Sequence, residues 1–253
     1  MNEINVVLIF VVVANIMLVA IMYFFRSKFP TSLTKEQQNV AIAPFTFVIT
    51  LYAFLLSFVV INLWQTFSQA DQSVAREAET IVIIYRLTES FPDSHDARHT
   101  ITEYLSSVVH EEWPAMADGK ASPKTKELAN QIWQEVQALT ASTPEQLIYK
   151  AELLTQLSKL AEYRSDRLLM VGGSIPSIMW EVLFCGGLLM LVGLYYFSIG
   201  STREQIVIDF IVIAMLLITV YLGLEFDNPF GGLVKVSPKA FELIGNYIHQ
   251  LPQ

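Results

Sequence analysis

Four long apolar runs constrain this chain more than any other feature of its 253 residues. They lie in two pairs, residues 5–25 with 40–61 and residues 175–199 with 206–224, on either side of a polar block of about a hundred residues. An α-helix of about 20 apolar residues crosses the hydrocarbon core of a bilayer, and each run has about that length. The pattern therefore predicts an all-α membrane protein with four transmembrane helices and an extramembrane domain inserted between spans two and three.

The polar block carries an excess of acidic residues. The formal net charge of the chain is −8, and residues 68–173 hold 10 Lys and Arg against 16 Asp and Glu, a net charge of −6. Because contacts to phosphate require Lys and Arg, such a domain is a poor binder of nucleic acid, and no nucleic-acid partner is expected. The single cysteine, Cys185, excludes a disulfide within the chain.

A helical pattern continues past the end of the second apolar run. No Gly or Pro occurs between Trp64 and Pro92, and apolar residues recur at helical spacing over this stretch. The sequence predicts one helix over residues 41–91, roughly 75 Å long at 1.5 Å per residue. Such a helix carries span two out of the bilayer and into the polar domain.

The rest of the polar block predicts a helical bundle. Apolar spacing indicates helices over residues 98–113, 124–139 and 145–170, and Thr143 before Pro144 is a typical helix start. We expect the first and last helices of the bundle to continue into spans two and three. The predicted divisions are transmembrane helices one and two (1–67), the helical bundle (68–174), transmembrane helices three and four (175–226), and a turn with an amphipathic C-terminal helix (227–253).

Small residues in span three and an apolar stripe in the tail predict two packing faces. Gly186, Gly187 and Gly193 allow a neighbouring helix to approach span three closely in lipid. The tail, residues 238–251, has one apolar helical face that either lies on the membrane or docks on the helical domain. The stripe on this face consists of Phe241, Ile244, Ile248 and Leu251.

Span two supplies the candidate pore-lining residues. A stripe of small and polar side chains runs along it, and a stripe of large apolar side chains runs along its opposite side. The first stripe is either an interface at which hydroxyls bond across to another helix, or the lining of a pore whose narrow part is apolar. The polar stripe is Thr46, Thr50, Ala53 and Ser57, followed later by Asn62; the apolar stripe is Phe47, Leu51, Phe54, Phe58 and Ile61.

Two acidic residues fall inside predicted spans. Glu181 lies about one turn into span three, and Asp209 lies about one turn into span four. Ionisable groups are costly in lipid, so each is either interfacial and reaches the headgroups, or lines a vestibule or a cleft between subunits. The two spans are antiparallel, and we therefore expect the two carboxylates to lie near opposite membrane faces and not to pair.

No group of residues has the pattern of an active site. His110 and Glu111 start a sequence that lacks the second histidine of a zinc-protease helix. His95, Asp96 and His99 have a spacing that can hold a metal, but a solvated helix start explains it as well. We predict no enzyme activity, no metal and no cofactor.

Several phrases of the sequence together resemble a bacterial family of membrane proteins of unknown function that is described as bestrophin-like. The likeness covers nearly the whole chain. The phrases are Leu51-Tyr52-Ala53-x-Leu55-Leu56-x-Phe58-Val59-Val60, then Glu111-Glu112-Trp113-Pro114-Ala115-Met116-Ala117, then Pro176 with Trp180, and Asp227-x-Pro229-Phe230-x-Gly232 with Val236-Ser237-Pro238.

The wider resemblance is to bestrophins, which are pentameric anion channels whose second span lines the pore neck and continues into a long cytosolic helix. It implies a homo-oligomer, a pentamer by this resemblance, in a bacterial inner membrane, with lipid and inorganic ions as partners and the helical domain in the cytosol. The turn Asp227, Asn228, Pro229, Phe230 matches one that leads into a calcium clasp in bestrophins. The acidic run of that clasp is absent, because residues 232–235 follow instead, so no calcium binding is expected here.

Two functions follow as hypotheses. The first is an oligomeric ion channel with span two around the pore axis, because one four-span chain is too thin to enclose a pore. The second is a non-conducting scaffold or sensor whose acidic helical domain binds a protein partner. The residues leave the sign of the conducted ion open, since Thr, Ser and Asn have no fixed charge and the acidic domain favours cations at a pore mouth.

Overall fold

Helices make up all the regular structure in the described part of the chain. The computed structural model describes residues 2–29, 34–173, 175–197 and 202–250, and no strand occurs among them. This confirms the predicted all-α fold. In chain order the helices are α1 (Asn2–Lys28), α2 (Lys35–Thr88), α3 (His95–Ser107), the π-helix η1 (Val108–Glu112), α4 (Trp113–Ala117), α5 (Pro123–Ala138), α6 (Pro144–Leu169), α7 (Ser177–Tyr196), α8 (Thr202–Asp227) and α9 (Lys239–Gln250).

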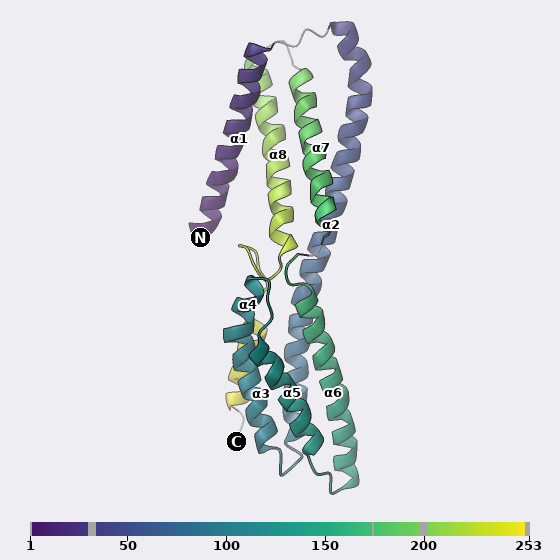
Figure 1. Ribbon diagram of the computed structural model, residues 1–253, viewed down its shortest axis with the longest axis vertical. Helices are drawn as coiled ribbons and strands as arrows, with labels where there is room; N and C mark the ends of the chain where they lie inside the picture. Colours follow the sequence, from purple (N-terminus) through teal and green to yellow (C-terminus); the bar gives the residue numbers. More distant parts are fainter. Residues whose placement is uncertain (1, 30–33, 174, 198–201, 251–253) are drawn as a thin grey trace. The chain divides into compact units, whose positions relative to one another are not determined.

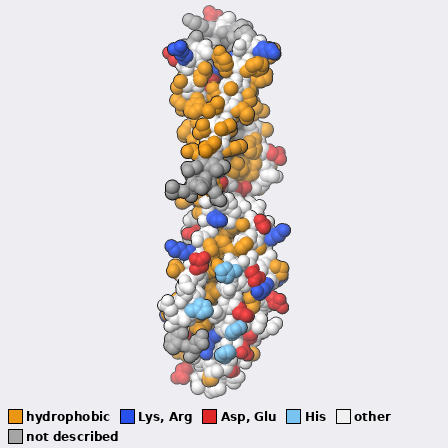
Figure 2. Space-filling view, turned by 90° about the vertical axis from the view of Figure 1, so that its left-hand side faces the viewer, with side chains coloured by type: hydrophobic (Ala, Val, Ile, Leu, Met, Phe, Trp, Pro, Cys, Tyr) orange, Lys and Arg blue, Asp and Glu red, His pale blue; other side chains and the backbone are white. Residues whose placement is uncertain are grey.

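Four of these helices confirm the predicted membrane spans. α1, α2, α7 and α8 are each long and apolar enough to cross a bilayer. The membrane-spanning segments form one compact unit, Met1–Trp64 with Ile175–Phe226, called here the membrane unit (Figure 1). Apolar side chains dominate the face of this unit seen in Figure 2, as expected where lipid or another subunit takes the place of water.

Glycines of α7 let α2 pack against it inside the membrane unit. A Cβ added at Gly186 would overlap the Tyr52 ring, and one added at Gly193 would overlap the Phe45 ring. The Tyr52 hydroxyl donates a hydrogen bond to the Leu183 carbonyl oxygen of α7, at 3.0 Å. The close approach predicted for this face of span three is therefore confirmed.

The second compact unit comprises Gln65–Ser174 with Asp227–Gln253 and is called here the helical unit. It contains the second part of α2 together with α3, η1, α4, α5, α6 and α9, which pack around one apolar core (Figure 1). α2 runs without interruption through residues assigned to both units, as the sequence predicted for span two. On the face seen in Figure 2 the helical unit shows acidic, basic and histidine side chains.

The prediction that span three also continues a helix of the bundle is wrong. α6 ends at Leu169 and α7 begins only at Ser177. Between them Gly172 and Gly173 have φ angles of 92° and 106°, a region that side-chain-bearing residues avoid. Pro176 then sets the start of α7, because a proline lacks the N–H needed to continue a helix. These residues end one helix and start another.

A second difference concerns the helix predicted over residues 98–113, which was expected to end just before Pro114. The helical backbone instead passes from α3 through η1 into α4 and reaches Ala117. The Trp113 N–H donates to the Val108 carbonyl oxygen, five residues back, which is the hydrogen bond of a π-turn. Pro114 lies in the first turn of the α-helix that follows, where its missing N–H costs little.

The tail docks on the helical unit. Of the two positions that its sequence allowed, the membrane surface and the helical domain, it therefore takes the second. Phe241 and Ile248 of α9 are buried in the core of that unit. The Arg86 guanidinium lies over the ring of Tyr247 and donates a hydrogen bond to its hydroxyl. The last residue of the predicted stripe, Leu251, lies outside the described residues.

Candidate functional site

The polar stripe of α2 is exposed on the surface of the membrane unit. Thr46, Thr50, Ala53 and Ser57 are all exposed. Each of the three hydroxyls donates a hydrogen bond of 2.8 Å to the backbone carbonyl oxygen four residues earlier on α2 itself. The donors of the stripe are thus satisfied within the helix, which allows it to face lipid, a neighbouring subunit or water.

Asn62 does not belong to this stripe. It follows Thr46 by 16 residues, about 4.4 helical turns, so the two side chains leave the helix on nearly opposite sides. Asn62 is half-buried and its amide donates to the Phe58 carbonyl oxygen at 2.8 Å. Of the five candidates on α2, four therefore share one face and one does not.

The apolar stripe of α2 is as exposed as the polar one, but it lies beside the polar stripe, about 100° around the helix, and not opposite it as expected, because Phe47 directly follows Thr46. Phe54 is 73% exposed and Phe47 is 65% exposed, although large aromatic side chains normally pack inside a structure. A third face of α2, with Leu56, Val59 and Leu63, is buried within the membrane unit. In this part of α2 one face packs inside the unit, and two faces remain for contacts with surroundings outside it.

Asp209 of α8 is buried and forms an ion pair that sequence reasoning missed. Its side chain is 2% exposed, and its Oδ2 lies 2.5 Å from Nη1 of Arg26 near the end of α1. Gln205, one turn earlier on α8, donates to the other carboxylate oxygen at 2.8 Å. Arg26 also donates to the Leu194 carbonyl oxygen of α7. The pair thus joins three helices of the membrane unit.

The other predicted intramembrane acid has a different environment. Glu181 is exposed on α7 and lines a mainly apolar groove between α2 and α7, together with Tyr52 and Cys185. Asn15, in the middle of α1, is buried and donates to the Phe210 carbonyl oxygen of α8 at 3.1 Å. The structure therefore places the two acids in separate sites, one paired with Arg26 and one on an apolar surface.

The helical unit contains a fully buried ion-pair network. Arg167 of α6 contacts Glu77 of α2 twice, with Nε at 2.7 Å from Oε2 and Nη2 at 2.9 Å from Oε1. The same Nη2 lies 2.8 Å from Oε2 of Glu112, in the π-helix η1. All three side chains are 0% exposed. One guanidinium thus joins three elements that lie far apart in the sequence.

Two further residues complete the network. The Tyr104 hydroxyl donates to Glu77 Oε1 at 2.7 Å, and Arg164 donates to Glu112 Oε1. Two arginines therefore balance two carboxylates, which is the condition for keeping charges in a core. Burial and the neighbouring Glu77 raise the pKa of Tyr104 well above its usual range. Burial alone lowers the pKa of Arg167, but the attraction of Glu77 outweighs it, so that the pKa is raised and the guanidinium stays charged.

Aromatic rings surround the network and bring together two of the quoted sequence phrases. The guanidinium of Arg167 lies 5.5 Å from the ring centroid of Trp113 and 5.7 Å from that of Phe241. The ring of Phe230, in the turn after α8, lies edge-on to Trp113 with centroids 5.6 Å apart. The indole N–H donates to the Val236 carbonyl oxygen at 3.3 Å. The turn is therefore anchored in the core beside Arg167.

That turn has a fixed local structure. The Gly231 N–H lies 3.2 Å from the Asn228 carbonyl oxygen and 3.1 Å from its side-chain Oδ1, and a Cβ at Gly231 would overlap the Asn228 side chain. Pro229 is buried, and its carbonyl oxygen accepts from the Val236 N–H at 2.8 Å. Asp227, the last residue of α8, lies beside Gly173, which is in the interruption between α6 and α7.

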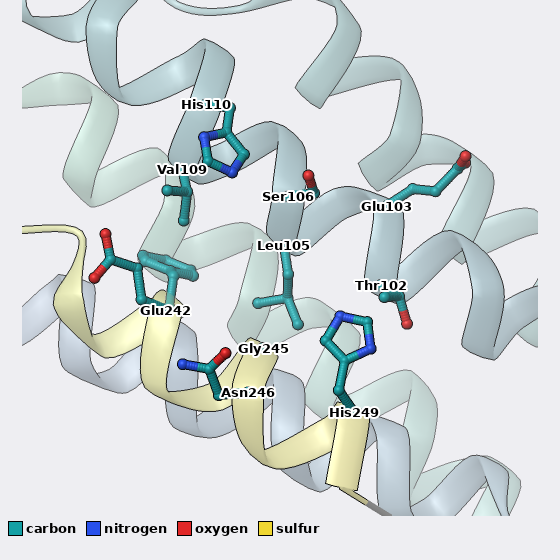
Figure 3. A pocket seen from close by; sticks show the side chains of 11 residues that line it. Thr102, Glu103, Leu105, Ser106, Val109, His110, Glu242, Gly245, Asn246 and His249 are labelled. Atoms are coloured by element: carbon teal, nitrogen blue, oxygen red, sulfur yellow. The ribbon is translucent and has the colours of Figure 1, made fainter.

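The four histidines gather around two neighbouring hollows of the helical unit. His110 and His249 line a cavity of about 570 Å³ between α3, η1 and α9, which also contains Glu242 (Figure 3). His95, His99 and His249 line a second hollow that shares Thr102 with the first. Within the described ranges no three His, Cys, Asp or Glu residues are grouped closely enough to hold a metal ion.

Comparisons with known proteins agree with this architecture. Solved structures of a bacterial bestrophin homolog from Klebsiella pneumoniae share the fold at low identity. One, phased by Zn-SAD, has a TM-score of 0.71 at 16% identity and covers 97% of this chain and 100% of that chain. Two mutated forms of the homolog have TM-scores of 0.73 and 0.72 at 16% identity. They cover 96% and 95% of this chain, respectively, and each matches 97% of its own length.

A match to a family model adds to the likeness of fold. No curated protein matches the chain. The family model of the Bestrophin-like domain matches residues 9–241, which include all four spans and nearly all of the helical unit. The match agrees with the resemblance expected from the sequence phrases. This chain is a multi-pass membrane protein that belongs to the Bestrophin-like family.

Proposed function

We propose that this protein is an oligomeric ion channel in which several copies place α2 around a common pore axis. The observation that carries the proposal is the exposure of two adjacent faces of α2 inside the membrane unit, one lined by Thr46, Thr50, Ala53 and Ser57 and one by aromatic and aliphatic side chains. Two unpartnered faces on one helix are what a ring of subunits requires. One face contacts the neighbouring copy and the other faces the axis.

Several finer features of the proposal come from the family. A homo-oligomer of five copies, a bacterial inner membrane and a cytosolic helical unit are the arrangement expected of bestrophin-type channels. The partners are then lipid, inorganic ions and other copies of the chain. Particle symmetry of the purified protein tests the assembly directly, because a five-fold ring supports it and a two-fold dimer or a monomer contradicts it.

The polar stripe is the proposed lining of the pore. Hydroxyls of Thr50 and Ser57 can accept hydrogen bonds from water or contact a permeating ion while their own protons stay bonded to the helix backbone. The competing arrangement turns the helix so that Phe54 and Phe58 narrow the pore and the polar stripe packs on the next copy. An apolar constriction of that kind would gate by excluding water.

Cysteine accessibility distinguishes these two arrangements. In a background that replaces the single native cysteine, Cys185→Ser, we would introduce Thr50→Cys, Ser57→Cys or Phe54→Cys and record currents in planar bilayers. A charged methanethiosulfonate reagent is expected to reduce the current of the Thr50→Cys and Ser57→Cys channels and to leave that of Phe54→Cys unchanged. The reverse pattern would assign the axis to the apolar stripe. The reversal potential in a KCl gradient gives the sign of the conducted ion.

The channel proposal itself fails under clear conditions. Bilayers containing the purified protein would then show no conductance above protein-free controls, and none of the α2 cysteines would alter it. A protein that also stays monomeric in detergent and in nanodiscs supports the alternative, a non-conducting scaffold or sensor whose acidic helical unit binds a protein partner.

A further inference from the structure

A third cavity of the helical unit has a composition unlike its surroundings. It has a volume of about 330 Å³ and lies between α5 and α6. Ala129 of α5 and Ala161 of α6 line it, and their small side chains leave space between the two helices. The other lining residues are Lys126, Asn130 and Trp133 from α5, and Arg164, Ser165, Leu168 and Leu169 from α6.

The lining of this cavity contains two basic side chains in a strongly acidic domain, although one of them, Arg164, is already paired with Glu112. Residues 68–173 have a net charge of −6, yet Lys126 and Arg164 line the cavity and no carboxylate does. Lys126 and Asn130 are one turn apart on α5 and so share a face, and Arg164 and Ser165 of α6 line the same cavity. Two cations, an amide and a hydroxyl are donors suited to an oxyanion.

Arg164 has donor capacity left over. Its Nη2 is bonded to Glu112 in the buried network, and its side chain is only 13% exposed. Its Nε is buried and has no hydrogen-bond partner among the described residues. The other terminal nitrogen, Nη1, is bonded to no described residue and is not among the buried unpartnered atoms, so it is the donor that Arg164 can offer to an oxyanion in the cavity.

The apolar part of the lining restricts the ligand further. The indole of Trp133 and the side chains of Leu168 and Leu169 provide a surface on which a ring can lie. Inorganic phosphate would use the donors and leave this surface uncovered. We propose that the cavity between α5 and α6 binds a small organic anion, a carboxylate carried on an aromatic or aliphatic body, with Lys126 and Arg164 holding the carboxylate.

This assignment does not depend on whether the protein conducts ions, and binding can be measured on the full chain in neutral detergent. Isothermal titration would use 2-naphthoate as the probe, with 2-naphthalenemethanol as its uncharged analogue and inorganic phosphate as the anion without an apolar body. We expect saturable binding of 2-naphthoate, and at least ten-fold weaker binding of the other two.

Two lysine variants locate the bound anion. Lys126→Gln removes the exposed cation of the cavity and is expected to weaken 2-naphthoate binding by about five-fold, the loss of one charge-assisted hydrogen bond. Lys159→Gln is the matched control, because Lys159 is an exposed lysine of α6 outside the cavity lining. It is expected to change the affinity by less than two-fold.

Arg164→Lys keeps the charge but loses Nη1, and it should weaken binding without unfolding the helical unit.

Four results would overturn the assignment. Equal affinities of the two lysine variants would place the anion elsewhere. Equal binding of 2-naphthalenemethanol would show an apolar site or partition into detergent. Equal binding of phosphate would show a site for a plain anion that does not use Trp133. An absence of saturable 2-naphthoate binding in any oligomeric state would remove the site altogether.

Discussion

The two units each contain an arginine paired with a buried carboxylate, and the two sites differ in burial and in the number of charges they join. In the helical unit Arg167 bonds Glu77 and Glu112, and all four carboxylate oxygens accept hydrogen bonds. In the membrane unit the partly exposed Arg26 has one acidic partner, Asp209. Each site leaves one arginine Nε buried without a partner among the described residues, that of Arg164 in the first and that of Arg26 in the second. The first site thus joins two carboxylates and two arginines in a core, whereas the second is a single pair.

Because of this difference, replacing a residue is expected to lower the free energy of unfolding by different amounts at the two sites. Removal of Arg167, the central arginine of the network, leaves the buried Glu77 without a cationic partner and leaves the buried Glu112 with Arg164 alone. The pair in the membrane unit lies near the ends of α1 and α7, and Arg26 is partly exposed, so a lone charge there can reach headgroups or water. The predictions below rank the sites by that reasoning, from the largest expected effect to the smallest.

Replacement of Arg167 by Met is expected to have the largest effect. It leaves Glu77 and Glu112 buried, and the expected loss is about 3–5 kcal/mol in the free energy of unfolding. Chemical unfolding followed by tryptophan fluorescence measures it, because Trp113 lies beside Arg167. Arg76→Met, at an exposed position of α2, is the control and should stay within about 0.5 kcal/mol. A similar small loss for both variants would contradict a buried network that depends on Arg167.

Replacement of Asp209 by Asn should cost less than replacement of Arg167. The amide is nearly the same size, but Arg26 loses its charged partner, and the expected loss is about 1–3 kcal/mol. The double variant Arg26→Gln with Asp209→Asn tests the coupling, because two neutral amides can bond each other and recover part of the stability. Thermal unfolding in nanodiscs compares the three proteins. If the losses of the single variants simply add, the two residues do not form the described pair.

The Tyr104 hydroxyl predicts a pH effect confined to alkaline conditions. The folded state raises the pKa of Tyr104 above its ordinary value of 10, so this tyrosine stays neutral in the folded protein when it ionises in the unfolded chain. The contribution of Tyr104 to the free energy of unfolding is fully present below about pH 10 and falls as the pH rises further. The difference in unfolding free energy between the native chain and Tyr104→Phe should therefore shrink between pH 9 and pH 11. A constant difference would contradict the assignment.

The smallest effect is expected for an exposed ion pair of the helical unit. Lys124 and Glu111 lie 2.5 Å apart, but both side chains are largely in water. Lys124→Gln should change the unfolding free energy by about 0.5 kcal/mol or less, and added salt should remove the difference. A loss comparable to that of Asp209→Asn would show that exposure does not set the ranking.

Local signals in the sequence predicted much of the fold. Run length identified four spans, the absence of Gly and Pro predicted the continuous α2, and Thr143 before Pro144 predicted the start of α6. The Thr143 hydroxyl indeed accepts from the Gln146 N–H at 3.2 Å. Such features depend on residues within a few positions of one another, which is the range over which sequence patterns are informative.

The charged sites could not be predicted in the same way. Arg167 pairs with Glu77 across 90 residues and Arg26 pairs with Asp209 across 183, so no spacing rule connects either pair. Asp209 lies one turn inside an apolar run, which indicates that it needs a partner. Arg26, at the end of span one, was a possible partner that was not identified from the sequence. Glu77 gave no such signal, because it lies in a polar stretch of α2 among carboxylates that are exposed, Asp71, Glu79 and Glu89.

The π-helix η1 has a consequence for how this chain tolerates length changes. A π-turn contains one residue more than the α-turn it replaces, so removal of a single residue from Val108–Glu112 could leave a regular α-helix between α3 and α4. Because the wide turn holds its extra residue locally, the helix beyond such a deletion would keep nearly the same orientation. A deletion in the α-helical part of α3 would instead turn Glu112 and Trp113 by about 100° about the helix axis and away from Arg167. The network should therefore tolerate a change of length at η1 better than one in the helix before it.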